Sequence, residues 1–168
     1  LRHHPMTPVS GNLNGDITVV EFFDYQCGYC KRTLTSIIEL LQSDKKVRVV
    51  WKELPILGPG SRIAARAAMA ANKQARYLDL HIAIMRERGR LSENKIMAAA
   101  KNLGLDIDKL RHDMKDPAID AYLDETKQLA NKLGIRGTPA LIIEGTIVPG
   151  AIDTADIKRI IAQFRAGG

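Results

Sequence analysis

The stretch VVEFFDYQCGYCKRTL, from Val19 to Leu34, contains both cysteines of the 168-residue chain, Cys27 and Cys30. Its first half is rich in β-branched and aromatic residues and is almost continuously apolar, which favours a strand buried on both faces. After the cysteines, apolar residues recur at helical spacing as far as Leu41, which predicts an amphipathic helix. The cysteine pair is therefore expected where a buried strand ends and a helix begins.

A structural disulfide is the weakest of three roles for this pair. A disulfide stabilises mainly by restricting the unfolded chain, and the effect grows with the length of the loop that it closes. The loop from Cys27 to Cys30 is so short that the chain-entropy formula gives only about 2 kcal/mol. A secreted scaffold protein would use more cysteines and longer loops.

A metal site is the second role. Structural zinc usually takes four ligands, such as two C-x-x-C motifs or a C-x-x-C motif with paired histidines. Here His3 and His4 lie in a polar N-terminal stretch, His81 lies on an apolar helical stripe and is expected in the core, and His112 lies among charges and is expected at the surface. The histidines do not complete a zinc site, although two thiolates are soft ligands that suit Cu(I).

A redox centre is the role that the local physics favours. A helix N-terminus carries unpaired N–H groups and a partial positive charge, and both stabilise a thiolate. Cys27, at the helix start, is expected to be the exposed nucleophile. Cys30, one turn further in, is expected to face the core and to resolve a mixed disulfide.

The composition excludes two other classes of protein. The net charge is +6, but basic and acidic residues are mixed along helical faces, as in MRERGR from Met85 to Arg90, so no nucleic-acid partner is expected. No apolar run is long enough to cross a bilayer, and no signal peptide precedes the first strand. Residues 1–15 are polar and contain two prolines, so we expect a loose arm that is too short and too polar to dimerise the protein. The expected state is a monomer, and the alternative is an oligomer formed through a removed N-terminal segment.

The rest of the chain divides into three parts by pattern. Residues 16–59 read as strand, helix and strand, which indicates a βαβ unit with a parallel sheet. Residues 60–133 carry only helical stripes, with Ser92 and Asp116 as expected helix caps and a short helix expected after Asp106. Residues 134–168 read as a β-hairpin turning at Glu144 and Gly145, followed by a helix capped by Asp153.

These features together resemble the thioredoxin-fold family, and specifically its DsbA-like branch. The shared features are the CGYC motif after a buried strand, the Thr138-Pro139 pair in GTPALII, and helices inserted between the βαβ and ββα halves. The CGYC motif and the threonine before proline are similar to those of DsbC- and ScsC-like relatives. The resemblance implies an α/β thioredoxin fold with an inserted all-helical subdomain.

The resemblance also implies a function. It predicts an exported, periplasmic thiol–disulfide oxidoreductase that acts on cysteine-containing exported proteins and exchanges electrons with a membrane redox partner. No dissociable cofactor is expected, because a disulfide between Cys27 and Cys30 is itself the redox group.

Three further site residues follow from the resemblance. Pro139 is expected in a cis peptide bond, with Thr138 offering backbone hydrogen bonds to an extended substrate beside the Cys27 sulfur. Glu21 is expected to be a buried acid that assists proton transfer at Cys30, with Lys52 as a possible ion partner. The alternatives are an ordinary trans proline and a glutamate that faces solvent at a sheet edge.

The direction of the reaction and one other function stay open. Tyr29 brings no charge to the motif, which predicts a milder, more reducing couple than that of the strongest oxidants, but oxidase and isomerase or reductase activity both remain possible. The alternative function is a Cu(I)-binding periplasmic copper-tolerance protein that uses the same two cysteines.

Overall fold

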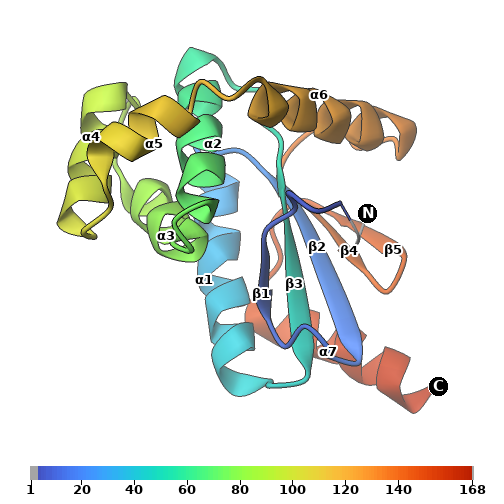
Figure 1. The fold of residues 1–168 in the computed structure, drawn as a ribbon. Coiled ribbons are helices and arrows are strands. Elements are labelled where there is room, and N and C mark those ends of the chain that lie inside the picture. Colours follow the sequence, from blue (N-terminus) through green and yellow to red (C-terminus); the bar gives the residue numbers. More distant parts are fainter. Residues whose placement is uncertain (1–3, 168) are drawn as a thin grey trace.

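A five-stranded sheet forms the centre of the protein in the computed structural model, which describes residues 4–167 (Figure 1). The strands follow the order β1-β3-β2-β4-β5, in which β2 and β3 are parallel and every other neighbouring pair is antiparallel. Their bounds are Val9–Gly11 for β1, Ile17–Phe23 for β2, Val47–Glu53 for β3, Ala140–Ile143 for β4 and Thr146–Pro149 for β5.

The central strand β2 is buried along its whole length, as its apolar sequence predicts. Because side chains alternate along a strand, Val19 and Phe23 join one apolar cluster, while Val20 and Phe22 join another on the opposite face. The sheet is therefore covered on both sides, and the C-terminal end of β2 delivers the chain to Cys27.

Strand β1 lies in the segment that the sequence predicts to be a flexible arm, and that prediction is wrong for its second half. Val9 pairs with Val50 across the antiparallel β1–β3 ladder, and the indole of Trp51 donates to the Ser10 hydroxyl at 2.8 Å. Backbone hydrogen bonds to the free edge of β3 hold the segment, so an apolar pattern is not needed. Residues 1–3 of the expected arm lie outside the described residues.

Helices cover both faces of the sheet. α1 (Gly28–Ser43) and α7 (Thr154–Ala166) contact each other over one face, and the C-terminal half of α6 (Pro117–Lys132) packs against the other. Between β3 and β4 the chain forms the helical insertion, which ends with α6 and is all-helical as expected (Figure 1). Its first four helices are α2 (Pro59–Asn72), α3 (Tyr77–Arg86), α4 (Glu93–Asn102) and α5 (Ile107–Asp113).

The helix caps follow the sequence. The side chains of Ser92, Asp106, Asp116 and Asp153 accept hydrogen bonds from backbone N–H groups in the first turns of α4, α5, α6 and α7. The hairpin turns at Glu144 and Gly145, where both residues have positive φ, as a type I′ turn requires. The fold class is therefore confirmed as an α/β thioredoxin fold with a helical insertion.

No helix among residues 4–167 combines the length and the apolar character that crossing a membrane requires.

Lys52 on β3 is a buried amine on the α6 face of the sheet. Its side chain is only 3% exposed, and its Nζ donates to the Thr7 hydroxyl at 2.9 Å and to the Tyr122 hydroxyl at 3.2 Å. Within residues 4–167 it makes no ion pair with a carboxylate, and burial lowers its pKa to about 8. The ammonium is therefore desolvated without a direct counter-ion.

Replacing Lys52 with methionine should stabilise the protein at pH 7 by about 1 kcal/mol, because a buried charge is removed while the linear shape is kept. The Thr7 and Tyr122 hydroxyls lie 2.9 Å apart and would keep each other as partners. The pKa of Lys52 is lower in the folded than in the unfolded chain, so wild-type stability should rise between about pH 8 and 10.5. The advantage of Lys52→Met should shrink over that range.

Urea unfolding between pH 6 and 10.5 measures both effects, with Lys127→Met as a control for an exposed lysine on α6. A Lys52→Met variant that is less stable than wild type at pH 7 would contradict the expectation.

Candidate active site

Cys27 caps the N-terminus of α1. Its backbone is extended, and its Sγ accepts the backbone N–H of Cys30 at 3.3 Å, the role that a serine or threonine hydroxyl plays at other helix starts. The sulfur also donates to the Thr138 carbonyl oxygen at 3.3 Å. The predicted placement at a helix start is confirmed, and so is the approach of residue 138, which is 111 positions away in the chain.

The expectation that Cys27 is exposed is wrong in degree, because the residue is only 7% exposed. The first turn of α1 lies on one side of the sulfur and the Thr138 carbonyl on another. Gly28 and Tyr29 next to it are open to solvent, and Tyr29 is 60% exposed with its ring 4.4 Å from the Arg32 guanidinium carbon. Cys27 therefore offers little surface to solvent, while its neighbours Gly28 and Tyr29 are exposed.

Cys30 faces the core, as expected, and is completely buried. Burial is the largest cause that raises the pKa of the Cys30 thiol far above its ordinary value, and a hydrogen bond with Cys27 adds to the rise. Both cysteines are free thiols in this structure. The buried Cys30 thiol therefore resists losing its proton.

The Thr138–Pro139 peptide bond is cis, and the trans alternative is excluded. The Pro139 carbonyl accepts the Gly150 N–H at 2.9 Å, which fixes the loop against the end of the hairpin. A hollow runs beside this loop, and Arg136 is its one charged lining residue; the others are Gly134, Ile135, Gly137, Thr138, Pro139, Ala140, Ile147, Pro149 and Gly150.

Glu21 is completely buried, so the solvent-facing alternative is excluded. Neither carboxyl oxygen has a hydrogen-bond partner among residues 4–167. Burial raises the pKa of Glu21 well above its ordinary value, and negative charge on Cys27 and Glu53 raises it further. Glu21 is therefore an acid that keeps its proton at neutral pH, within electrostatic range of the cysteines.

Lys52 is not the ion partner of Glu21, contrary to the sequence-based expectation. In the parallel register Glu21 lies beside Trp51, whereas Lys52 lies beside Phe22. Neighbouring residues on a strand point to opposite faces, so the ammonium of Lys52 and the carboxyl of Glu21 lie on different sides of the sheet.

Asp24 is a site residue that the sequence did not reveal. Its Oδ1 accepts the Gln26 N–H at 2.7 Å and the Ser61 hydroxyl at 2.6 Å, while its Oδ2 accepts the N–H groups of Ile56 and Leu57 at 2.8 and 2.9 Å. This carboxylate ties the turn before Cys27 to the loop after β3. The only signal in the sequence was an aspartate between a buried strand and the cysteine motif.

A second polar cluster behind the cysteines was also missed. Tyr25, two residues before Cys27, hydrogen-bonds to Glu53 at the end of β3 and to His81 on α3. His81 is in the core, as expected, but it is only partly satisfied, because its Nε2 has no partner among the described residues.

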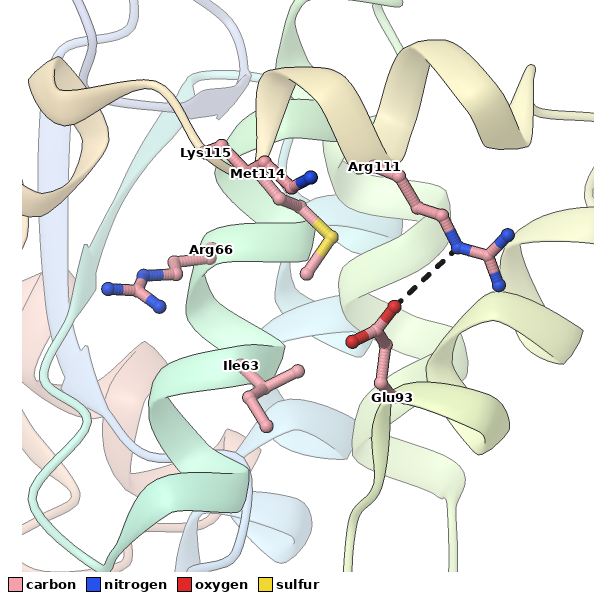
Figure 2. A pocket seen from close by; sticks show the side chains of 6 residues that line it. All are labelled: Ile63, Arg66, Glu93, Arg111, Met114 and Lys115. Carbon is pink, nitrogen blue, oxygen red and sulfur yellow. Dashed lines mark ion pairs between the residues drawn. The ribbon is translucent and has the colours of Figure 1, made fainter.

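A second hollow lies in the helical insertion, between α2, α4 and α5 (Figure 2). Arg111 and Glu93 approach across it, with 3.5 Å between Nε and Oε1. The lining residues are Ile63, Arg66, Glu93, Arg111, Met114 and Lys115, and none of them belongs to the cysteine site.

Within residues 4–167 no group of three or more histidine, cysteine, aspartate or glutamate side chains is arranged to hold a metal ion.

The fold and the paired cysteines at a helix start define a thioredoxin-fold dithiol protein. Residues 18–162 match the family model described as a DSBA-like thioredoxin domain, and the chain belongs to that family. It is 41% identical to a thioredoxin-like oxidoreductase from Silicibacter pomeroyi DSS-3, with a TM-score of 0.95 and coverage of 99% of this chain and 96% of that one. It is 33% identical to the thiol-disulfide exchange protein alpha-DsbA2 from Wolbachia pipientis, with a TM-score of 0.90 and coverage of 95% and 88%. The resemblance to DsbA-like proteins is confirmed at the level of the family.

The chain also matches part of much longer proteins. It is 28% identical over 161 residues to the Na(+)/H(+) antiporter NhaA 1 of Salinispora arenicola, an alignment that covers 95% of this chain and 25% of that protein. The chain thus spans about a quarter of the length of the first curated relatives that it matches.

The different burial of the two thiols predicts selective alkylation. One equivalent of iodoacetamide at pH 7.5 should label Cys27, while Cys30 should react more than about tenfold slower, because its protonated thiol is buried. Peptide mass spectrometry of the reduced protein after timed quenching measures the two rates. Equal labelling of both cysteines would contradict the assignment of the outer and inner thiols.

Proposed function

We propose that the protein exchanges disulfides with exported, cysteine-containing proteins, using Cys27 as the nucleophile and Cys30 as the resolving cysteine. The observation that supports this most directly is the contrast between the two sulfurs. The Cys27 sulfur accepts an N–H at a helix start and lies beside the cis-proline loop, whereas the Cys30 thiol is buried and protonated.

In the oxidising direction, a substrate thiolate attacks the Cys27 sulfur of the enzyme disulfide. A mixed disulfide forms, the Cys27–Cys30 bond breaks, and Cys30 leaves as a thiolate that takes up one proton. A second substrate thiolate then attacks the substrate sulfur of the mixed disulfide and releases Cys27 as a thiolate. The substrate has lost two electrons and the enzyme has gained them, and the reducing direction follows the same steps in reverse.

Thr138 and Pro139 position the substrate in this proposal. Proline lacks an N–H, so an extended substrate segment would pair with the backbone of Thr138, whose carbonyl oxygen already lies 3.3 Å from the Cys27 sulfur. The hollow beside the loop would then take substrate side chains, with Arg136 as its charged contact.

Glu21 supplies the proton to the Cys30 thiolate in this proposal. A carboxyl group that stays protonated at neutral pH suits this role, because the leaving sulfur is shielded from bulk water. In the reverse step the Glu21 carboxylate would accept the proton from the Cys30 thiol.

The couple should be milder than that of the strongest oxidants, and a membrane redox partner would regenerate the active form. Tyr29 is exposed between the cysteines and carries no charge that would stabilise a thiolate. Without such a charge the Cys27 thiolate of the reduced protein is less stabilised, so the Cys27–Cys30 disulfide should be harder to reduce.

The reduction potential in a glutathione buffer tests the proposed function and its direction. We expect a value more negative than the about −120 mV of a strong DsbA oxidant, and a less negative value for Tyr29→His, with each 30 mV equivalent to about 1.4 kcal/mol. Cys27→Ser should abolish exchange, and Cys30→Ser should accumulate mixed disulfides with a reporter peptide. A wild-type potential near −120 mV would overturn the proposed direction.

Exchange with glutathione and a titration with Cu(I) together test the copper-binding alternative. A protein that shows no exchange with glutathione but binds Cu(I) stoichiometrically and tightly would be a Cu(I)-binding protein instead. Isothermal titration of the reduced protein with Cu(I) measures this binding.

Glu21→Gln should slow the opening of the Cys27–Cys30 disulfide by on the order of 100-fold, because the leaving thiolate loses its proton donor. The pKa of Glu21 is raised in the folded chain, so wild type should lose stability as the pH rises above the ordinary carboxyl range. Glu21→Gln should remove that part of the pH dependence. Stopped-flow reduction and urea unfolding at pH 5 and pH 8 measure the two effects, and an unchanged rate would exclude the proposed role.

A further inference from the structure

Four buried side chains form a hydrogen-bonded cluster that includes a residue of the turn before Cys27. They are Tyr25, Glu53, Tyr77 and His81. Glu53 Oε1 accepts the Tyr25 hydroxyl at 2.9 Å and the Tyr77 hydroxyl at 2.8 Å, and the Tyr25 hydroxyl lies 2.9 Å from His81 Nδ1. Glu53 ends β3, Tyr25 lies in the turn before Cys27, and the other two residues belong to α3. The cluster therefore ties the helical insertion to the turn that carries the reactive cysteine.

Counting protons fixes the direction of these bonds. Tyr25 has one hydroxyl proton and donates it to Glu53, so its oxygen accepts from His81 Nδ1–H. Burial lowers the pKa of His81 to about 3, so the ring is neutral and its Nε2 carries a lone pair. Within residues 4–167, both side-chain hydrogen bonds to Glu53 are then donations to Oε1, and such donations favour the carboxylate form.

Glu21 lies in the opposite situation. Its two oxygens have no hydrogen-bond donor among residues 4–167, and negative charge on Glu53 makes its ionisation harder still. Two buried carboxyl groups that interact in this way lose their protons in sequence, and the one with donors loses its proton first.

The other titratable groups around Glu53 fit this order. The pKa of Glu53 is raised to about 8, chiefly by burial; the two tyrosine hydroxyls lower it and Asp24 raises it. Charge on Glu53 in turn acts on groups of three other elements, namely Tyr25 in the turn before α1, Tyr77 on α3 and Tyr122 on α6. Negative charge on Glu21 raises the pKa of Cys30 on α1, and Lys52 lies on the opposite face of the sheet.

We propose that Glu53 is a positioning residue for disulfide exchange. Held by Tyr25 and Tyr77, it loses its proton before Glu21 does, and once ionised its negative charge keeps Glu21 protonated for the leaving Cys30 sulfur. This inference rests on the proposed function of Glu21, although the coupling between the two acids is a property of the fold that can be measured without turnover.

The first experiment follows the carboxyl carbons of Glu21 and Glu53 by NMR titration of the reduced protein labelled with ¹³C at glutamate. In Glu53→Gln the titration midpoint of Glu21 should fall by about one pH unit, because the competing charge is gone. In Tyr77→Phe the midpoint of Glu53 should rise, because one donor is lost. Lys52→Met, one residue away but facing α6, is the matched control and should leave the Glu21 midpoint unchanged.

The second experiment measures how fast dithiothreitol opens the Cys27–Cys30 disulfide, as the ratio of variant to wild type at each pH. The ratio for Glu53→Gln should fall by up to about tenfold above the lowered Glu21 midpoint and stay near one below it. A purely structural role for Glu53 would change the rate equally at every pH.

The outcomes separate the two ideas. An unchanged Glu21 midpoint in Glu53→Gln overturns the inference, whatever the activity, and Tyr77→Phe serves the same purpose through the Glu53 midpoint if Glu53→Gln does not fold. A shifted midpoint with a pH-independent rate ratio overturns the role in exchange but leaves the coupling. Absence of disulfide exchange in the wild-type protein would overturn the proposed function, while the shift of the Glu21 midpoint in Glu53→Gln would remain.

Discussion

The central strand β2 is hydrogen-bonded on both edges and covered on both faces, and this constraint governs the site at its end. Any polar group that β2 carries must find partners inside the protein or stay uncharged, because an unpaired charge in a dry interior costs several kcal/mol, on the order of the stability of a whole domain. Glu21 on β2 meets the requirement by keeping its proton, whereas Asp24, the first residue after the strand, is buried with four hydrogen-bond donors. The two acids are three residues apart in the chain, yet one is stabilised by hydrogen-bond donors and the other by remaining protonated.

Burial also explains why the two cysteine sulfurs differ in their environments. Cys27 lies at the boundary of the core, where the N-terminal turn of α1 offers an N–H to its sulfur. Cys30 lies one turn deeper, where burial disfavours a thiolate, and we propose that its proton is exchanged with a neighbouring group. In the proposed mechanism this group is Glu21, the buried acid on β2.

The helical insertion does more than cover the sheet. Through Tyr77 and His81 it reaches Glu53 and Tyr25, and through Ser61 it reaches Asp24. Both contacts end in the turn immediately before Cys27, so the position of the reactive sulfur depends on residues that follow it in the chain by thirty or more positions. A rigid scaffold of this kind is what a site of defined geometry requires.

The sequence by itself determined the βαβ–helices–ββα order, the helix caps and the pair of cysteines at a helix start, because these features arise from local periodicity and capping chemistry. With the family resemblance it also determined the cis proline beside Cys27. Only the tertiary structure decided that β1 pairs with the edge of β3, since that pairing uses backbone groups that leave no side-chain pattern. Only the register decided that Lys52 points away from Glu21. The hydrogen-bond partners of Asp24 and Glu53 could not be predicted from the sequence either. These bonds join distant segments and depend on how the helical insertion packs, which local sequence patterns do not determine.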